Sequence, residues 1–375
     1  MIGRTLTRPI QERMFQGKAI LLIGARQVGK TTLLKQWVQG LDDSHLWLNC
    51  DEPDLRLRLT NPTSTQLKEL FGKTRIVVID EAQRVRNIGL TLKLITDELS
   101  HVQLLVSGSS ALELSDHINE PLTGRKFEFF LYPLSHSELV GEFGSIHESR
   151  LLEDRLIYGS YPDIVVESEH REELLSQLAG SYLYKDLFNY QDIRKPEVLR
   201  LLLEALALQV GNQVSWNELA QTVGSDQATV RRYVDLLEKA FVLFPLRAFS
   251  RNVRNELKKS RKIYFFDNGI RNALVRNFNP LSLRSDTGAL WENYLISERF
   301  KYNMYTSNHC HSRFWRTTQQ QEVDYLEEKG GRLTAYEFKW NPKTKVRFPR
   351  TFTQAYPDCE THLITTENFR NFVGT

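Results

Sequence analysis

The sequence has few cysteines and no long apolar run. Its 375 residues include three cysteines, which lie far apart and form no CxxC pair, so neither a disulfide framework nor a zinc knuckle is expected. The longest apolar runs, at 19–23, 76–79 and 201–203, are far shorter than the ~20 residues that cross a bilayer, and the first 16 residues lack an apolar leader core. We therefore expect a cytoplasmic protein with reduced, structural cysteines and no membrane segment.

Low-complexity sequence and a strong net charge are absent as well. Hydrophobic residues make up 41% and charged residues 25%, which is ordinary globular usage, and the length suits several domains at about 150 residues each. The net charge of +3 does not indicate a nucleic-acid partner, but between 247 and 276 nine basic residues face two acidic ones, a local charge of +7. This basic stretch is a candidate contact for an acidic partner.

A glycine-containing loop follows the first apolar run. Residues 24–32 fit the pattern G-x-x-x-x-G-K-[ST] between a predicted strand and a predicted helix. The two glycines let backbone N–H groups close around phosphates, Lys30 reaches the β and γ oxygens, and Thr31 binds Mg²⁺. The candidate ATP-binding residues are Gly24, Ala25, Arg26, Gln27, Val28, Gly29, Lys30, Thr31 and Thr32.

A second apolar run, at 76–79, ends in two adjacent carboxylates. Asp80 is expected to complete the Mg²⁺ shell, and Glu81 to polarise the attacking water. A solvated loop would also explain two acidic residues, but it would not explain a phosphate loop earlier in the chain. Together the two motifs predict Mg²⁺-dependent ATP hydrolysis.

Two further features lie between this motif and residue 135. Ser107 and Ser109 end a third apolar strand, and a hydroxyl there serves either the nucleotide or a helix N-cap. Arg125 follows a glycine turn and precedes a strand, and its planar guanidinium suits the charge that develops on a phosphoryl group. We interpret Arg125 as an arginine finger or sensor, with an ordinary surface arginine as the alternative.

The order of strands and helices sets the fold class. Strands alternate with amphipathic helices from residue 18 to about 140, with Thr31–Val38 and Leu90–Leu99 as crossover helices. This alternation predicts an α/β fold with a doubly wound parallel sheet and the nucleotide at the carboxyl ends of the strands.

The middle of the chain predicts a winged helix. Two short helices around a Gly224 turn, the second with core positions 230, 233, 234 and 237, are followed by two strands that flank the basic stretch. Side chains that could approach phosphates or base edges are Gln227, Arg231, Arg232, Lys258, Lys259, Arg261 and Lys262. A winged helix used for protein packing or as an oligomer hinge is the alternative.

The last hundred residues carry carboxylates and a lysine in a nuclease-like order. Glu292 lies on a predicted helix, Asp324 on a strand, and Glu337 and Lys339 on the next strand, which matches the PD-(D/E)xK pattern. There, carboxylates hold Mg²⁺ beside the scissile phosphate while the lysine activates water. No proline precedes Asp324, and Trp340 follows the lysine. A half-buried hairpin with a Glu–Lys pair, in an inactive nuclease-like fold, is the alternative.

In their order these motifs resemble prokaryotic AAA-type ATPases fused to a C-terminal domain of unknown function, DUF4143. The resemblance covers nearly the whole chain and rests on residues 24–32, 79–83, 124–125, 159–162, 265–269, 287–292 and 322–325. It implies ATP and Mg²⁺ at the first two motifs and a nuclease-like C-terminal part. It also implies that Ser107 or Ser109 senses the γ-phosphate, and that the arginine often comes from a neighbouring subunit.

Four parts are expected on this basis. They are an AAA-type P-loop ATPase domain at 1–145, a helical lid or linker at 146–195, a winged-helix domain at 196–278, and a mixed α/β nuclease-like domain at 279–375. The favoured function is an ATP-hydrolysing switch or motor that binds duplex or branched DNA and self-associates with ATP. An ATP-coupled DNA endonuclease and a protein-remodelling ATPase without nucleic acid are the alternatives.

Overall fold

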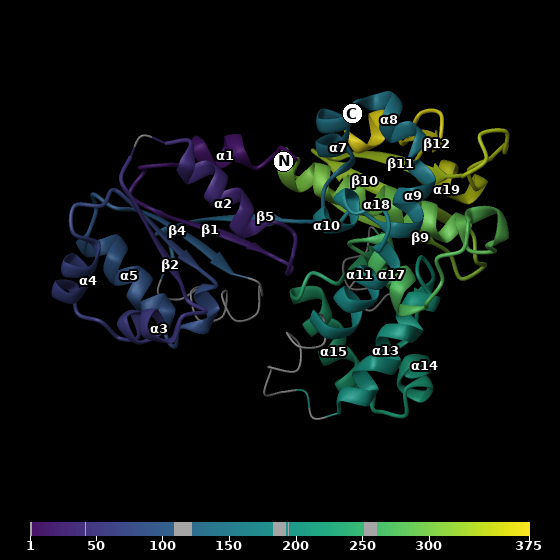
Figure 1. Ribbon diagram of the computed structural model, residues 1–375. Coiled ribbons are helices and arrows are strands. Elements are labelled where there is room, and N and C mark those ends of the chain that lie inside the picture. The colour runs from purple at the N-terminus through teal and green to yellow at the C-terminus, as the bar shows by residue number, and fades with distance from the viewer. Residues whose placement is uncertain (1, 42, 109–121, 183–192, 194, 251–260) are drawn as a thin grey trace. The chain divides into compact units, whose positions relative to one another are not determined.

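The computed structural model describes residues 2–41, 43–108, 122–182, 193, 195–250 and 261–375 (Figure 1). Contacts divide the chain into two compact units. Unit 1 is Met1–Pro133 with Lys239–Phe241, and unit 2 is Leu134–Glu238 with Val242–Thr375. Residues 134–145 therefore belong to unit 2, while the division into four functional parts remains a prediction.

Unit 1 is built on a five-stranded sheet in the order β2-β3-β4-β1-β5. All neighbouring strands are parallel. The strands are β1 (Ala19–Gly24), β2 (His45–Asn49), β3 (Ile76–Asp80), β4 (Gln103–Gly108) and β5 (Lys126–Leu131). Every residue of β1, β3 and β4 is buried, because helices cover both faces of a parallel sheet and its central strands are therefore apolar throughout.

The helices of unit 1 lie on both sides of this sheet. They are α1 (Thr7–Gln11), α2 (Lys30–Gln39), α3 (Pro53–Leu59), α4 (Ser64–Phe71), the 3₁₀ turn η1 (Ala82–Arg84) and α5 (Ile88–Glu98). The chain moves from β1 to the edge strand β2 and then back through β3 to β4. Right-handed crossovers therefore place α2 on one face and α4 and α5 on the other (Figure 1). The predicted doubly wound α/β sheet is confirmed, with α2 and α5 as crossover helices.

Unit 2 contains a mixed seven-stranded sheet in the order β12-β11-β10-β9-β7-β8-β6. Its strands are β6 (Gln213–Val214), β7 (Leu243–Ala248), β8 (Arg261–Phe265), β9 (His311–Arg316), β10 (Glu322–Lys329), β11 (Arg332–Phe338) and β12 (Glu360–Ile364). The β7–β9 and β11–β12 pairs are parallel, and the other pairs are antiparallel. The two strands expected in a wing thus lie in the same sheet as the strands expected in the nuclease-like part.

The helices of unit 2 fall into an early group, a middle group and a late group. The early group is α7 (His136–Phe143), α8 (Ser145–Arg150), α9 (Leu152–Tyr158), α10 (Pro162–Val166), α11 (Arg171–Gln177) and the π turn η2 (Leu178–Tyr182). The middle group is α13 (Pro196–Leu208), α14 (Trp216–Thr222), α15 (Gln227–Lys239) and α17 (Asn268–Leu274). The late group is η3 (Leu281–Leu283), α18 (Thr287–Tyr305), α19 (Arg350–Ala355) and α20 (Phe369–Val373). On α15 the predicted core positions Val230, Tyr233, Val234 and Leu237 are all buried. No helix among the described residues is both long and apolar enough to cross a membrane.

Two sequence motifs of the resemblance meet inside unit 2. The Asp267 carboxylate accepts a hydrogen bond from the Ser160 backbone N–H (2.7 Å) and caps α17 through the Ile270 N–H (3.1 Å). Gly159 has φ +74°, and a Cβ there would lie 2.1 Å from the Asp267 carboxylate. A glycine is therefore required by both the backbone conformation and the close approach. These motifs join two helical segments and have a structural role.

Candidate functional site

The phosphate-type loop lies at the carboxyl edge of the unit 1 sheet, between β1 and α2. Gly29 has φ +93° and ends the loop, and α2 begins with no side-chain cap and no acidic residue in its first turn. A Cβ at Gly24 would lie 2.2 Å from the Leu131 carbonyl oxygen, so a side chain is excluded there. A helix N-terminus without a side-chain cap is a ready anion site.

Lys30 is buried against the loop that it would serve. Its ammonium donates to the carbonyl oxygens of Gly24 (3.0 Å) and Ala25 (2.7 Å). Arg4, which no sequence motif indicates, holds the same loop, because its guanidinium donates to the carbonyl oxygens of Val28 (3.1 Å) and Tyr132 (2.5 Å). No spacing rule links Arg4 to the loop, since the contact depends on how the N-terminal segment folds back.

The structure places Asp80, Thr31 and Ser107 together. The Thr31 hydroxyl donates to both Asp80 oxygens (3.0 and 3.2 Å), and the Ser107 hydroxyl donates to the same carboxylate. Because β4 lies between β1 and β3, Ser107 is adjacent to the loop ends of both neighbours. Ser109, the alternative, lies outside the described residues.

Glu81 is fixed by its backbone and by a neighbour. It has φ +55°, in the left-handed region, its N–H donates to the Ser107 hydroxyl (3.2 Å), and the Gln83 amide donates to its carboxylate (2.5 Å). A non-glycine residue in this region is strained, and such strain concentrates at functional sites. The arrangement orients the Glu81 carboxylate relative to Asp80.

The Cys50 thiol is chemically unreactive. Burial, reinforced by the charge of Asp80, raises the pKa of Cys50 to about 12, so the thiol stays protonated and unreactive at neutral pH. All three cysteines are free.

Arg125 does not reach the loop of its own chain. It immediately precedes β5, whose Lys126 pairs with Ala19 and whose Leu131 pairs with Gly24. Arg125 is therefore at the amino edge of the sheet, about 20 Å along the strands from the loop. Its guanidinium pairs with Asp97 (2.6 Å). Arg125 therefore does not reach the nucleotide loop of its own chain, because parallel strands begin and end at opposite edges, and its role in a neighbouring copy stays a prediction.

The residues at the loop fit ATP with Mg²⁺. An uncapped helix N-terminus and Lys30 offer donors for phosphate oxygens, and Thr31 and Asp80 offer two hard oxygen ligands. Mg²⁺ in such sites takes one or two protein ligands and completes its shell with phosphate oxygens and water. Bound there, the metal would neutralise charge on the phosphates.

In unit 2, the prediction that Lys262 contacts DNA is wrong. It is 1% exposed, and its ammonium pairs with Glu292 (3.0 Å) and with Glu322. Neighbouring strand residues point to opposite faces, so Lys262 points inward while Arg261 points to the other face. A buried, paired ammonium cannot contact a DNA backbone.

This lysine joins the carboxylates of the nuclease-like pattern. Glu292 on α18 also accepts a hydrogen bond from the Tyr264 hydroxyl (2.5 Å), and Glu322 pairs with Arg316 (3.3 Å). Lys262, Tyr264 and Glu322 were not expected at this site. The signal that could have indicated Lys262 and Tyr264 is the polar alternation Lys-x-Tyr within an apolar strand.

Asp324, Glu337 and Lys339 form the second half of the cluster. The Lys339 ammonium lies 3.2 Å from Glu337 and 3.6 Å from Asp324, and Asp324 accepts the Phe338 N–H (2.9 Å). Asp324 also acts electrostatically on Glu292 and Lys262. The structure therefore brings all four predicted nuclease residues into one cluster, which we call the carboxylate cluster and define as Lys262, Tyr264, Glu292, Glu322, Asp324, Glu337 and Lys339.

Burial sets the protonation of this cluster. Burial, then the charge of Asp324, raises the pKa of Glu337 to about 7, and burial likewise raises the pKa of Glu292. Burial opposes the charge on Lys262, but Glu292 and Glu322 outweigh it and raise the pKa of that ammonium above its ordinary value. Lys262 is therefore a permanent internal cation.

An arginine row lies across three neighbouring strands of unit 2. Arg261 on β8 is opposite Arg247 on β7, and Arg247 is in register with Arg313 on β9. The guanidinium groups of Arg231 and Arg261 both lie over the Trp216 ring, at 5.7 and 5.4 Å. No described carboxylate forms an ion pair with these four arginines, which we call the arginine row.

Of the other predicted DNA contacts, two are exposed on α15 and two lie outside the described residues. Arg232 and Gln227 are exposed on α15, and the Gln227 amide donates to Asn217 (3.3 Å). Lys258 and Lys259 lie outside the described residues.

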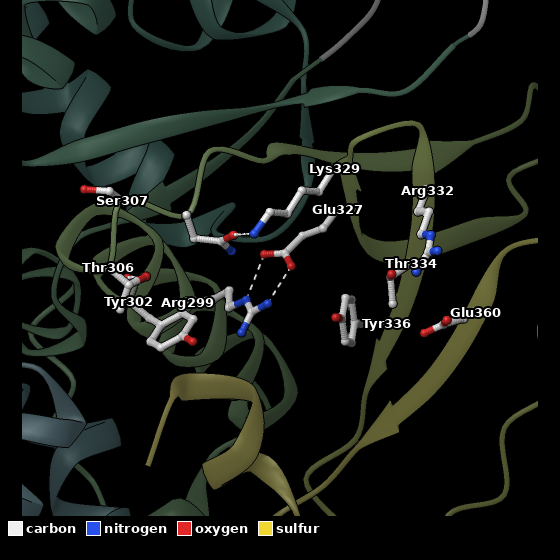
Figure 2. Close-up of a pocket in the computed structure, with 11 residues that line it drawn as sticks. Arg299, Tyr302, Thr306, Ser307, Glu327, Lys329, Arg332, Thr334, Tyr336 and Glu360 are labelled. Carbon is white, nitrogen blue, oxygen red and sulfur yellow. Dashed lines mark hydrogen bonds and ion pairs between the residues drawn. The ribbon is translucent and has the colours of Figure 1, made fainter.

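Unit 2 also contains a polar cavity of about 590 Å³ between α18 and the strands β10 and β11. Figure 2 shows Arg299 and Glu327 pointing toward one another within it. Their two ion-pair contacts measure 2.8 and 2.6 Å, and Asn303 donates to the same carboxylate (2.9 Å). The charges of Arg299 and Glu327 therefore compensate each other within this cavity.

Comparison with family models assigns three consecutive segments. Residues 16–140 match an AAA domain, residues 149–281 match the domain of unknown function DUF8612, and residues 287–372 match the domain of unknown function DUF4143.

Known proteins are similar over much of the chain. An uncharacterized protein of Mycobacterium tuberculosis is 28% identical over 335 residues, covering 88% of this chain and 72% of that protein. An uncharacterized protein of Haemophilus influenzae is 26% identical over 278 residues, covering 67% and 68%. Among solved structures, the Walker-type ATPase PABY2304 of Pyrococcus abyssi has a TM-score of 0.51 at 17% identity, covering 73% of this chain and 96% of that one, which is a likeness of fold. The chain therefore combines an AAA-type P-loop ATPase domain with a C-terminal DUF4143 domain.

Proposed function

We propose that the protein is a Mg²⁺-dependent ATPase that works as a nucleic-acid-binding switch or motor. The observation that carries the ATPase activity is the joint placement of Thr31, Asp80 and Ser107 beside the uncapped N-terminus of α2. Lys30 would leave the loop carbonyls for the β and γ phosphates, and Glu81 would polarise the attacking water. The AAA family match supports the same reading.

ATP-dependent self-association is part of the proposal. Arg125 is too far from its own loop, yet its side chain is 40% exposed, so it could serve the loop of a neighbouring copy. Light scattering with a slowly hydrolysed ATP analogue should show a mass increase at micromolar protein. That increase should be unchanged by Glu81→Gln. A monomeric mass under these conditions would contradict the proposal.

Nucleic-acid binding rests on the arginine row. Three arginines in register on adjacent strands span about 10 Å, and two of the four also flank an aromatic ring, Trp216. Arginine forks suit phosphate oxygens, and sequence-independent backbone binding needs only such a cationic surface. We propose that duplex or branched DNA contacts this row.

A charge-matched pair of variants tests this surface. Arg247→Ala, Arg261→Ala and Arg313→Ala together should lower DNA affinity and reduce the slope of log affinity against log salt by about 3. The control combines Arg150→Ala, Arg332→Ala and Arg350→Ala, which removes three exposed charges elsewhere in unit 2 and should leave the slope nearly unchanged. Equal losses in both variants would indicate a net-charge effect, and no DNA binding by the parent would favour a protein partner.

A further inference from the structure

The carboxylate cluster contains two ammonium groups among four carboxylates. Lys339 was expected from the sequence pattern, whereas Lys262 comes from a strand of the predicted winged helix. Lys262 is held on one side by Glu292 and on the other by Glu322, and Asp324 acts on it electrostatically. It is buried from solvent, so it is a fixed constituent of the cluster.

Each carboxylate that a divalent cation would need already has at least one oxygen facing an ammonium, a guanidinium or a hydroxyl. One Glu292 oxygen accepts from both Lys262 and Tyr264, and Glu322 is shared between Lys262 and Arg316. Asp324 and Glu337 both face Lys339. In the part of the chain that the structure describes, no three His, Cys, Asp or Glu side chains are grouped so that they could hold a metal ion. A nuclease metal therefore does not fit this cluster as it is arranged.

The electrostatics explain why an internal lysine belongs there. Carboxylates gathered in a partly buried site repel one another, and the site is stable only if a cation lies among them. A nuclease-type centre uses a divalent metal for this purpose. Here Lys262 already supplies the charge, and a metal entering beside it would meet both the repulsion of the ammonium and the loss of its ion pairs.

We propose that the Lys262 ammonium occupies the place of the divalent cation, so that unit 2 is a metal-free, nuclease-like module that does not cut nucleic acid. That unit 2 binds nucleic acid rests on the proposed function. Lys262 fixes α18 to strands β8 and β10, and so joins the predicted winged-helix segment to the C-terminal strands. It is a positioning residue. The inference does not depend on ATP hydrolysis, because every group it uses lies in unit 2.

Manganese binding tests the proposal directly. The full chain would carry Lys30→Ala and Asp80→Asn to silence the ATP site, and free Mn²⁺ would be followed by electron paramagnetic resonance without nucleotide. This parent should bind no stoichiometric Mn²⁺ at 1:1 mixing in the ~100 μM range, where a divalent-cation site with a Kd on the order of 10⁻⁵ M or tighter would be mostly filled. Adding Lys262→Met to this parent should create a site that binds Mn²⁺ at least tenfold more tightly than the parent does. Adding Glu292→Gln and Glu322→Gln to that variant should remove the site.

Each other outcome counts against the proposal. Stoichiometric Mn²⁺ binding by the parent, lost in Asp324→Asn, would show that a metal and Lys262 coexist. A folded Lys262→Met protein that binds no Mn²⁺ would show that the lysine does not occupy a metal position. If Lys262→Met does not fold, the parent titration still decides, together with a gel assay in which Mn²⁺-dependent nicking of plasmid DNA by the parent would overturn the proposal. Failure of the ATPase or of DNA binding would leave the Mn²⁺ titrations unchanged, because they contain neither nucleotide nor DNA.

Discussion

The carboxylates of the nucleotide site and of the carboxylate cluster have different kinds of partner. In unit 1, Asp80 accepts hydrogen bonds from two hydroxyl groups, those of Thr31 and Ser107. In unit 2, Glu292 and Glu322 receive the ammonium of Lys262. Hydroxyl groups leave the Asp80 charge available to a cation, whereas an ammonium cancels the charge that a cation would need. Carboxylates are therefore open to a cation in unit 1 and held in ion pairs in unit 2.

The largest expected effect separates the two sites by activity. Glu81→Gln should lower ATP turnover by about 10²- to 10⁴-fold, since it removes the group that polarises water, while retaining ATP binding. Asp324→Asn, the matched carboxylate change in unit 2, should leave turnover unchanged. Phosphate release under saturating Mg-ATP measures both, and similar losses in the two variants would break the comparison.

The second prediction concerns buried charge in unit 2. Glu327→Ala should lower the free energy of unfolding of that unit by about 3–5 kcal/mol, because it leaves the largely buried Arg299 without its carboxylate. Its control is Asp97→Ala in unit 1, where the Arg125 pair is 40% and 36% exposed and the cost should stay below about 1 kcal/mol. Urea unfolding followed by fluorescence gives both values. Equal costs would mean that burial does not distinguish the two ion pairs.

The third prediction uses pH. Because the folded pKa of Glu337 is raised to about 7 from an ordinary 4.5, the folded state binds the proton more tightly than the unfolded chain. This contribution to stability is complete below about pH 4.5 and disappears as pH rises through 7, by up to about 3 kcal/mol. Glu337→Gln should remove that decline. Parallel stability curves for the parent and the variant between pH 4.5 and 7.5 would show that Glu337 has an ordinary pKa.

The smallest predicted effect is at the phosphate loop. Arg4→Met should weaken ATP binding about fivefold, because the loop loses the hydrogen bond to the Val28 carbonyl oxygen. Maximal turnover should change little, since the carbonyl oxygens of Val28 and Tyr132 that Arg4 binds do not act on the phosphate. Calorimetric titration of ATP into a Glu81→Gln background, with and without Arg4→Met, isolates the binding step. An unchanged affinity would assign Arg4 to packing alone.

The nucleotide site could be predicted from sequence because its chemistry is local. A phosphate loop needs its glycines, Lys30 and Thr31 within one turn and one helix start. Asp80 ends a buried strand that is recognisable by itself. The position of Arg125 away from the loop of its own chain also follows from the sequence, because a residue that precedes a parallel strand lies at the edge opposite the loop. Strand direction, as well as residue type, decides which arginines can reach a phosphate.

The carboxylate cluster could be predicted only in part. Glu292, Asp324, Glu337 and Lys339 have a recognisable order, but the role of Lys262 depends on which face of β8 is covered by α18, a helix that begins 25 residues later. Charge counting alone assigned Lys262 to the same surface as Arg261. Alternation along the strand separates them, and the partner of each face is a tertiary fact.

ATP turnover in the presence of DNA tests the central claim most directly. Turnover should rise when duplex or branched DNA is added, disappear in Glu81→Gln, and lose its DNA response while keeping its basal rate in the variant with Arg247→Ala, Arg261→Ala and Arg313→Ala. Turnover that is the same with every DNA, in the parent and in that variant alike, would contradict the account and assign the arginine row to another partner.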